Sequence, residues 1–500
     1  MTQGELLANA AKAASSFSSL GIGENGAVAM VLRNDFAFFE AAMGAALVGA
    51  YAVPVNWHSK ADEAGYIISD CGAGAVVVHA DLLPQIEAGI PAGVRVFVVP
   101  TPSEIREAYG IAKADCDVPE GCAAWPDFIA CQKPWSEPPK AQRSNMIYTS
   151  GTTGRPKGVR RQPADAAMQA TANRMLSRVF DIRQGEGMRT VITGPVYHSA
   201  PNAYALAAAR AGGLIVLQPR FDAEELLRLV EQHRVTHLHM VPTMFVRLLK
   251  LPPDVRRRYD LSSLRFVVHA AAPCPPEVKK QMIQWWGPII NEYYGGTETG
   301  AAIFHTSEEG LKKPGTVGRP VEGAICKIFD ATGRELGPNQ VGEVFVRITG
   351  YPDFTYNRMD DKRREVERQG LITCGDVGYI DEDGYLFLCD RVRDMVISGG
   401  VNIYPAEIEA VLITMPGVAD CAVFGIPDEE YGEQLCVYVQ PQPGSAPTAD
   451  AVRSFLRQRM AGYKVPKVVE FASELPREDS GKIFKRKLRA PYWEKAGRQI

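Results

Sequence analysis

Buried-strand patterns alternate with helical patterns along most of the N-terminal half of this chain. Short apolar runs at residues 28–32, 75–78 and 190–193 predict buried strands, and residues 36–49 and 223–232 have the apolar spacing of helices. Parallel strands need long crossover connections, which are usually helices, so this alternation predicts parallel sheets with helices on both faces. We therefore expect an α/β fold with doubly wound sheets.

Composition excludes several classes of protein. A net charge of −3 gives no reason to expect a nucleic-acid partner, and the longest apolar run, residues 41–55, is too short and too interrupted to span a membrane. Ten cysteines without a CxxC pair indicate neither a zinc site nor a disulfide framework. Free thiols and the lack of a signal-peptide pattern predict a cytoplasmic protein. The sequence is compatible with a monomer or a homodimer.

Residues 148–158 read Tyr-Thr-Ser-Gly-Thr-Thr-Gly-Arg-Pro-Lys-Gly and follow a short strand-like segment. Glycines let main-chain N–H groups approach an anion, and the hydroxyls and the lysine can bind phosphate oxygens. The segment is not a Walker loop, because a strand-like segment follows it and no Gly-Lys-Ser/Thr closes it. Composition alone leaves an ordinary surface turn as the alternative. The candidate phosphate ligands are Thr149, Ser150, Gly151, Thr152, Thr153, Gly154 and Lys157.

The complete string closely resembles the signature loop of the adenylate-forming superfamily. This superfamily includes acyl-CoA synthetases, the adenylation domains of peptide synthetases and firefly-type luciferases. Further motifs occur in the family's order over nearly the whole chain. The resemblance implies that the loop holds the β- and γ-phosphates of ATP, and that ATP, Mg²⁺ and coenzyme A take part in the reaction.

Three further segments resemble the family's nucleotide-binding motifs. His-Ala-Ala-Ala-Pro at residues 269–273 resembles the segment beside adenine, with alanines where glycine is more usual. The string Asn-Glu-Tyr-Tyr-Gly-Gly-Thr-Glu resembles the motif that contacts adenine and phosphate and helps hold Mg²⁺ through Glu298. Cys-Gly-Asp at residues 374–376 resembles the ribose clamp. The implied ATP-binding residues are Ala271, Ala272, Pro273, Glu292, Tyr293, Tyr294, Gly295, Thr297, Asp376 and Arg391.

The pair Tyr197-His198 resembles the aromatic–histidine pair of the family's acyl channel. A lone histidine is more often structural, but amino-acid-activating relatives carry aspartate at this position, so His198 argues against an amino-acid substrate. Glycines at residues 295 and 296 leave one side of the pocket without side chains, which favours a bulky apolar acid over acetate. The implied acyl-pocket residues are Tyr197, His198, Ala270, Gly295, Gly296 and Ala301.

The resemblance also divides the chain into domains. It implies an N-terminal adenylation domain over residues 1–390, which includes a small β-barrel-like part. A hinge follows at residues 391–394, where Arg393 occupies a position that is commonly Asp or Lys. A small mobile α+β C-terminal domain over residues 395–500 completes the expected fold.

Catalysis is expected to involve both domains. Lys482 lies in a Gly-Lys-Ile string that resembles the family's catalytic-lysine motif, and it would bridge carboxylate and α-phosphate oxygens in the first step. In the second step Gly399 and Gly400 would adjoin coenzyme A. The implied catalytic residues are Lys482, Thr297, Glu298 and His198.

The expected function is that of an acid–CoA ligase of fatty acid metabolism. Its substrate would be a medium- or long-chain, aromatic or alicyclic acid. The main alternative is a stand-alone adenylation enzyme that loads an acyl group onto a carrier protein. A luciferase-like oxygenase and a non-catalytic nucleotide sensor are further alternatives, although a sensor has no need to keep Lys482.

Overall fold

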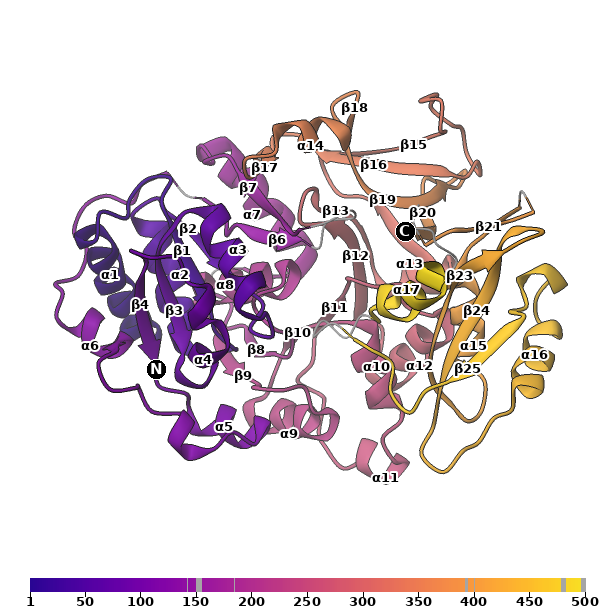
Figure 1. Cartoon of the computed structure of the whole chain (residues 1–500), viewed down its shortest axis with the longest axis horizontal. Coiled ribbons are helices and arrows are strands. Elements are labelled where there is room, and N and C mark those ends of the chain that lie inside the picture. Colours follow the sequence, from indigo (N-terminus) through magenta and orange to yellow (C-terminus); the bar gives the residue numbers. More distant parts are fainter. Residues whose placement is uncertain are drawn as a thin grey trace.

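The computed structural model describes residues 1–141, 143–149, 155–183, 185–391, 394–399, 401–477 and 483–495. These residues form four sheets flanked by helices. The N-terminal sheet lies at one end of the molecule and the C-terminal sheet at the other (Figure 1). The predicted α/β fold, with a large N-terminal part and a smaller C-terminal domain, is confirmed.

The first sheet is parallel, in the strand order β2-β1-β3-β4-β5. Its strands are β1 (Ala27–Val31), β2 (Tyr51–Pro54), β3 (Ala73–His79), β4 (Arg95–Val99) and β5 (Ala123–Ala124). The accompanying helices are α1 (Gln3–Ser19), α2 (Phe36–Leu47), α3 (Ala61–Cys71) and α4 (Leu83–Ile86). Along β1, Val28 and Met30 belong to one core and Ala29 and Val31 to another. Apolar side chains are therefore needed on both faces, which explains the continuous apolar runs in the sequence.

Residues 101–139 show no clear helical or strand periodicity of apolar residues in the sequence. The structure nevertheless has two helices there, α5 (Ser103–Tyr109) and α6 (Trp125–Ala130). Trp125 is only 1% exposed and donates a 2.9 Å hydrogen bond to Glu40. Helices of two turns or fewer contain too few apolar positions to reveal their period. The segment is therefore part of the core and more than a simple connection.

The second sheet has the strand order β15-β16-β19-β20-β14-β13-β12-β11-β10-β8-β9, and β18 pairs with β19. Its parallel strands are β8 (Arg189–Ile192), β9 (Leu214–Leu217), β10 (His237–Met240), β11 (Phe266–His269) and β12 (Ile290–Gly296). Its antiparallel strands are β13 (Gly300–His305), β14 (Thr316–Pro320), β15 (Ala324–Phe329), β16 (Gly342–Ile348), β18 (Glu367–Arg368), β19 (Leu371–Ile380) and β20 (Leu386–Arg391). The expected β-barrel-like part falls on these antiparallel strands, which continue the sheet of parallel strands.

Most helices of this region pack around the second sheet, whereas α14 lies beside β17 (Phe354–Tyr356) of a smaller sheet (Figure 1). They are α7 (Ala166–Phe180), α8 (Ser199–Ala211), α9 (Ala223–His233), α10 (Pro242–Leu249), α11 (Pro253–Arg256), α12 (Pro276–Trp286), α13 (Ser307–Lys312) and α14 (Asp360–Glu365). A hairpin turn at Asp383-Gly384, a dipeptide typical of such turns, joins β19 and β20, and Gly384 has a φ of +82°. Only glycine adopts such a φ at no steric cost, so the turn explains the residue.

A small antiparallel sheet, in the order β17-β7-β6, adjoins the second sheet. Its strands are β6 (Ile147–Thr149), β7 (Lys157–Arg161) and β17 (Phe354–Tyr356). The predicted phosphate loop connects β6 to β7, and Thr149 is paired with Lys157 at its base. This sheet therefore sets the two ends of the loop beside each other.

The C-terminal sheet has the order β22-β21-β24-β23, with β25 parallel to β24. Its strands are β21 (Val396–Ser398), β22 (Val401–Ile403), β23 (Val418–Asp428), β24 (Gly432–Pro441) and β25 (Val468–Phe471). Its helices are α15 (Pro405–Leu412), α16 (Ala449–Arg457) and α17 (Lys485–Lys495). Lys250, which follows α10, donates a 2.6 Å hydrogen bond to the carbonyl oxygen of Ala419, so this domain contacts the second sheet's helices.

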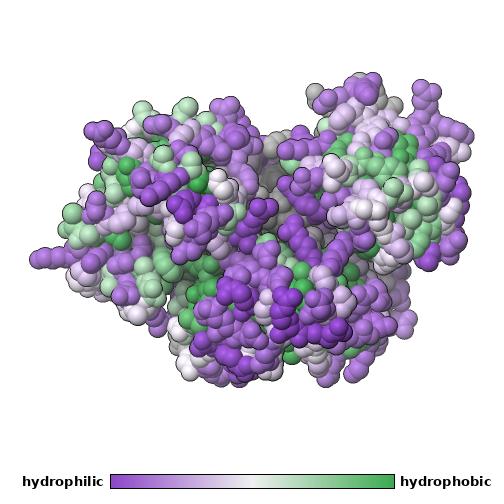
Figure 2. Space-filling view, turned by 90° about the horizontal axis from the view of Figure 1, so that it is seen from below, coloured by the Kyte–Doolittle hydropathy of each residue, from purple (hydrophilic) through white to green (hydrophobic). Residues whose placement is uncertain are grey.

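The surface and the thiols agree with the expectations from composition. The face in Figure 2 is mainly hydrophilic, and its apolar side chains form small separate groups. None of the helices in the described ranges is long and apolar enough to cross a membrane. All ten cysteines are free thiols, as predicted.

Candidate active site

The predicted ribose clamp is assembled from three strands of the second sheet. Tyr294 on β12 donates a 2.7 Å hydrogen bond to Oδ2 of Asp376 on β19. Arg391 is paired with Asp376 in the sheet, and its Nε lies 3.4 Å from Oδ1 of the same carboxylate. Burial, and next the charge of Asp376, raises the pKa of Tyr294 well above its usual value, so the phenol remains a hydrogen-bond donor. The structure thus brings these three predicted residues together.

Glu298, the predicted metal ligand, lies close to the same clamp. It belongs to the turn between β12 and β13, together with Thr297. Burial, and then the charges of Glu298 and Asp376, raises the pKa of the Cys374 thiol well above its usual value. Both carboxylates therefore act on the same thiol, so the candidate metal ligand and the candidate ribose ligand lie in one neighbourhood around Cys374.

Tyr356 on β17 connects Glu298 to the end of the phosphate loop. Its hydroxyl donates a 3.0 Å hydrogen bond to Oε1 of Glu298, and Nζ of Lys157 lies 4.9 Å from the centre of its ring. Burial, and next the charge of Glu298, raises the pKa of Tyr356, so its phenol also stays protonated. Tyr356 could not be identified from the sequence, because nothing local distinguishes it from other core tyrosines.

Glu298 could bind Mg²⁺ together with ligands from outside the protein. Within the described part of the chain, no group of three or more His, Cys, Asp or Glu side chains could hold a metal ion by itself. Mg²⁺ typically keeps several waters and is held by one or two carboxylates together with substrate phosphates. A single carboxylate beside a phosphate loop satisfies that requirement.

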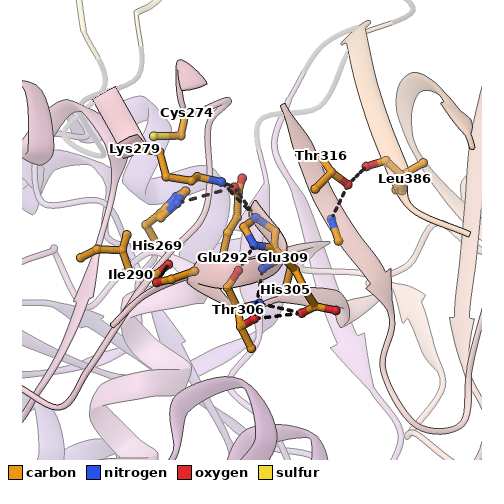
Figure 3. A network of polar contacts seen from close by, with 12 residues as sticks. His269, Cys274, Lys279, Ile290, Glu292, His305, Thr306, Glu309, Thr316 and Leu386 are labelled. Carbon is orange, nitrogen blue, oxygen red and sulfur yellow. Dashed lines mark hydrogen bonds and ion pairs between the residues drawn. The ribbon is translucent and has the colours of Figure 1, made fainter. Parts of the chain in front are cut away.

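Glu292, predicted to bind ATP, is the centre of a buried polar network (Figure 3). Its carboxylate forms an ion pair with Lys279 and a 3.1 Å hydrogen bond with His305, and Nε2 of His269 lies 3.6 Å away. Burial alone would raise the pKa of Glu292, but the charge of Lys279 lowers it well below its usual value. The carboxylate of Glu292 is thus bound by side chains of the protein itself, and its contact with ATP stays a prediction.

Tyr293, the residue after Glu292, points the other way from Tyr294. Its side chain is 7% exposed and belongs to the main core, where its hydroxyl lies 3.0 Å from Nε2 of His239. Successive side chains of a strand project to opposite faces. Of the two tyrosines, the structure therefore brings only Tyr294 to the clamp.

The segment predicted to lie beside adenine follows β11. Ala270 is buried, and Ala271 has a φ of +74°, a left-handed conformation that is unfavourable for residues with a Cβ atom. Ala272 and Pro273 continue the segment. Glycine would adopt the backbone of residue 271 without strain.

The predicted acyl-channel pair stands at the start of α8. Tyr197 is 5% exposed, and its ring lies 4.3 Å from that of His198, which occupies the N-cap position of the helix. Asn34, from the first sheet's region, fixes the preceding loop through a 3.0 Å hydrogen bond to the carbonyl of Gly194 and another from the N–H of Val196. Asn34 could not be identified from the sequence, since its partners lie about 160 positions away in the chain.

The two glycines assigned to the acyl pocket make room for protein atoms. A Cβ at Gly295 would lie 1.8 Å from the carbonyl oxygen of Gly300, and one at Gly296 would lie 2.5 Å from Sγ of Cys374. Ala301, also assigned to the pocket, is 7% exposed on β13. The absent side chains thus allow close approach of β13 and β19, and a role in the acyl pocket stays a prediction.

Gly399, predicted to adjoin coenzyme A, lies in the turn between β21 and β22 with a φ of +56°. Its N–H donates a 2.9 Å hydrogen bond to the carbonyl of Tyr431, whose ring would be 3.0 Å from a Cβ at this position. The other predicted residues lie outside the described residues. They are Ser150, Gly151, Thr152, Thr153, Gly154, Arg393, Gly400 and Lys482.

Comparisons with known proteins match the whole length of the chain. Residues 1–351 match the AMP-binding enzyme family, and residues 407–482 match the AMP-binding enzyme C-terminal domain. The fatty acid–[acyl-carrier-protein] ligase ScoC of Streptomyces coeruleorubidus is 31% identical, over 100% of this chain and 93% of the relative. Feruloyl-CoA synthase of an Amycolatopsis species is 32% identical, over 98% and 93% respectively.

Solved structures agree with these relatives. The structure of the anthranilate CoA ligase AuaEII in complex with anthranoyl-AMP superposes with a TM-score of 0.85 at 26% identity, over 98% of this chain and 92% of that chain. The match includes both the large and the small domain. The chain therefore belongs to the AMP-binding enzyme family, in its acyl-CoA synthetase branch, and is an AMP-forming acid–thiol ligase.

Proposed function

We propose that this enzyme converts an apolar carboxylic acid into its CoA thioester in two half-reactions. In the first, the carboxylate attacks the α-phosphorus of ATP, which forms acyl-AMP and releases pyrophosphate. In the second, the thiol of coenzyme A attacks the acyl carbon, which forms the thioester and releases AMP and a proton. The observation that carries the proposal is the cluster of Tyr294, Asp376 and Arg391 near Glu298, because it joins a ribose-binding arrangement to a metal ligand.

Each residue of the cluster has a role that its chemistry allows. The carboxylate of Asp376 accepts hydrogen bonds from the ribose hydroxyls of ATP, and Tyr294 holds that carboxylate in place. Arg391 adds a positive charge for the ribose and the phosphate. Thr149 and Lys157, at the two ends of the phosphate loop, bind the β- and γ-phosphates.

Mg²⁺ would be held by Glu298 together with the phosphates of ATP, where it would neutralise phosphate charge. Thr297, next to it in the same turn, would contact the α-phosphate and the substrate carboxylate. There is little covalent work for the protein, so catalysis depends on positioning and on stabilising charge at the phosphoryl oxygens. Lys482 would supply the positive charge for the first half-reaction, and rotation of the small domain about residues 391–394 would then exchange it for Gly399.

The acid is expected to be bulky and apolar. Tyr197, Ala270 and Ala301 are buried apolar side chains, and His198 stands where an ammonium-binding carboxylate would be needed for an amino acid. The similar enzymes named above are a fatty acid ligase, a feruloyl-CoA synthase and an anthranilate CoA ligase. A medium- or long-chain, aromatic or alicyclic acid is consistent with both observations.

A carrier protein is the second candidate acyl acceptor. The observation that favours it is the 31% identity to ScoC, whose name specifies an acyl-carrier-protein ligase. The first half-reaction would be the same, and only the thiol that receives the acyl group would differ. Coenzyme A is the primary proposal because feruloyl-CoA synthase and the anthranilate CoA ligase resemble the chain over a comparable length.

One experiment separates these possibilities. The purified enzyme is incubated with ATP, Mg²⁺ and a panel of fatty, aromatic, alicyclic and amino acids, and AMP, ADP and pyrophosphate are quantified with and without CoA. We expect AMP and pyrophosphate in equal amounts, and a thioester with CoA. Stoichiometric ADP and phosphate would refute the adenylation mechanism. Adenylation that proceeds to a thioester only with a phosphopantetheinylated carrier protein would assign the second candidate.

A further inference from the structure

Arg161 at the end of β7 forms hydrogen bonds with the turn that carries Thr297 and Glu298, two of the predicted catalytic residues. Its side chain is buried, with only 6% of the residue exposed. Nη2 donates hydrogen bonds to the carbonyl oxygens of both Thr297 (2.6 Å) and Glu298 (2.9 Å), and Nη1 donates one to the carbonyl of Pro352 (2.8 Å). In the described part of the chain, all hydrogen bonds of this guanidinium therefore end on main-chain carbonyls.

The surroundings of Arg161 are those of a buried cation without an acidic partner. Its guanidinium carbon lies 4.6 Å from the ring centre of Tyr351 and 5.9 Å from that of Phe354. No Asp or Glu carboxylate among the described residues forms an ion pair with it. Burying a charged group is unfavourable unless its donors are satisfied. Three main-chain carbonyls satisfy the donors here, and two of these carbonyls belong to the Thr297–Glu298 turn.

The same small sheet holds the side chain of Glu298 as well. Arg161 is paired with Phe354 on β17, and two positions along, Val159 is paired with Tyr356. Tyr356 donates the 3.0 Å hydrogen bond to the Glu298 carboxylate. Main chain and side chain of Glu298 are thus held by two adjacent strands, one of which begins at the phosphate loop.

We propose that Arg161 is a positioning residue for the adenylation half-reaction, which rests on the function proposed above. Its guanidinium ties the Thr297–Glu298 turn to the strand that ends the phosphate loop. The Thr297 hydroxyl and the Glu298 carboxylate are thereby held in place relative to Lys157 at the end of that loop. Its positive charge also offsets the negative charge that ATP and Glu298 bring to the site.

The planar guanidinium is needed because one nitrogen group must reach two successive carbonyls while the other reaches a third. A lysine at this position would keep the charge but lose the planar group with two terminal nitrogens. A methionine would keep most of the side-chain volume but lose both the charge and the planar group. These two substitutions of Arg161 therefore separate geometry from charge.

The test measures both half-reactions on the same preparation of each variant. Adenylation is followed as pyrophosphate release, and the second half-reaction as thioester formed from supplied acyl-adenylate and CoA. In Arg161→Met we expect adenylation to slow about 10- to 100-fold, the usual effect of removing a group that orients a metal ligand, while thioester formation changes less than about threefold. The ratio of the two rates is independent of how much of the sample is folded.

A second readout is the Mg²⁺ concentration that gives half-maximal adenylation at saturating ATP. It should rise about tenfold in Arg161→Met, because Glu298 is no longer held, and the KM for the acid should change little. Arg161→Lys should recover part of the adenylation rate. Its Mg²⁺ concentration for half-maximal adenylation should stay close to that of Arg161→Met. A purely structural role would lower the amount of active enzyme and leave both the ratio and the Mg²⁺ requirement unchanged.

The neighbouring arginine provides a matched control. Arg160 is the adjacent residue of β7, but its side chain points away from the turn, to within 3.3 Å of Asn25 and over the ring of Tyr51. Arg160→Met should keep the wild-type ratio of half-reactions and the wild-type Mg²⁺ requirement. Tyr356→Phe, which removes only the hydrogen bond to the Glu298 side chain, should raise the Mg²⁺ requirement in the same direction as Arg161→Met.

Two results would overturn the inference. Equal losses in both half-reactions, or an unchanged Mg²⁺ requirement in a folded Arg161 variant, would show that Arg161 only supports the fold. Should Arg161→Met yield no soluble protein, Arg161→Lys and Tyr356→Phe decide by the same readouts. Failure of the proposed function is a separate result, since the unsubstituted enzyme would then release no pyrophosphate with any acid.

Discussion

The phenol of Tyr294 donates a 2.7 Å hydrogen bond to the carboxylate of Asp376 and so connects β12 with β19, two strands that are not neighbours in the sheet. Because burial raises the pKa of Tyr294, the proton stays on the phenol and the carboxylate stays the acceptor. A carboxylate that is held in this way keeps its orientation toward a ribose.

Tyr294→Phe should weaken the use of ATP. Loss of one hydrogen bond to a charged group is worth about 1.5 kcal/mol, so the KM for ATP should rise roughly tenfold with a smaller change in kcat. Steady-state pyrophosphate release at varied ATP measures the effect. Asp376→Ala should be more severe, because it removes the ribose acceptor itself. An unchanged KM in Tyr294→Phe would show that the hydrogen bond has no part in ATP binding.

Lys482→Ala should abolish the first half-reaction and spare the second. An electrostatic contact to the reacting phosphoryl group is worth about 3 kcal/mol or more, so adenylation should slow at least about 100-fold. Conversion of supplied acyl-adenylate to the thioester should stay near the wild-type rate. Equal losses in the two half-reactions would contradict both the catalytic role and the exchange of Lys482 for Gly399.

Ala271→Gly should stabilise the protein. The left-handed φ of +74° at Ala271 costs about 1–2 kcal/mol, and glycine's greater freedom in the unfolded chain takes back about 0.4–1 kcal/mol. The expected net gain of about 0.5–1 kcal/mol would appear as a higher urea midpoint. Ala272, which has no positive φ, is the matched control, and Ala272→Gly should lower the midpoint. Destabilisation by both substitutions would argue against strain at Ala271.

Stability should fall as the pH decreases below about 6.5. Burial lowers the pKa of His239 to about 4 and that of His269 to about 3, from an ordinary value of 6.5. Between these values the unfolded chain binds protons that the folded protein does not, so each histidine removes about 1.4 kcal/mol of stability per pH unit. For His269, the charge of Lys279 adds to this effect and that of Glu292 opposes it.

The same linkage can be tested with His269→Gln, whose side chain does not titrate. Urea unfolding at a series of pH values between 6.5 and 4.5 should show a smaller slope of stability against pH than in the wild type, by about 1.4 kcal/mol per pH unit. Stability at pH 8 is the reference, because neither His269 nor its replacement is protonated there. A slope equal to that of the wild type would show that His269 takes up its proton in the folded state.

Much of the fold could be predicted from local patterns. The apolar runs of β1, β3 and β8 are strands because parallel strands are buried on both faces, and the Asp383-Gly384 turn forms a hairpin because glycine supplies the positive φ. The helices α5 and α6 could not be predicted, since two turns do not establish a period. The place of α6 in the core depends on Trp125, which packs against residues distant in the chain.

In the candidate site, too, some features follow from the sequence and others depend on contacts between distant parts of the chain. The sequence by itself determined which residue types are available, namely a glycine- and hydroxyl-rich loop, the acidic residues Glu298 and Asp376, and the family to which the chain belongs. Only the tertiary structure decided that Tyr294 faces Asp376, that Glu292 is enclosed with Lys279, and that Arg161 holds the turn of Glu298. The reason is physical: chemical identity is local to a residue, whereas a hydrogen bond across strands depends on register and pairing, which the packing of the whole chain sets.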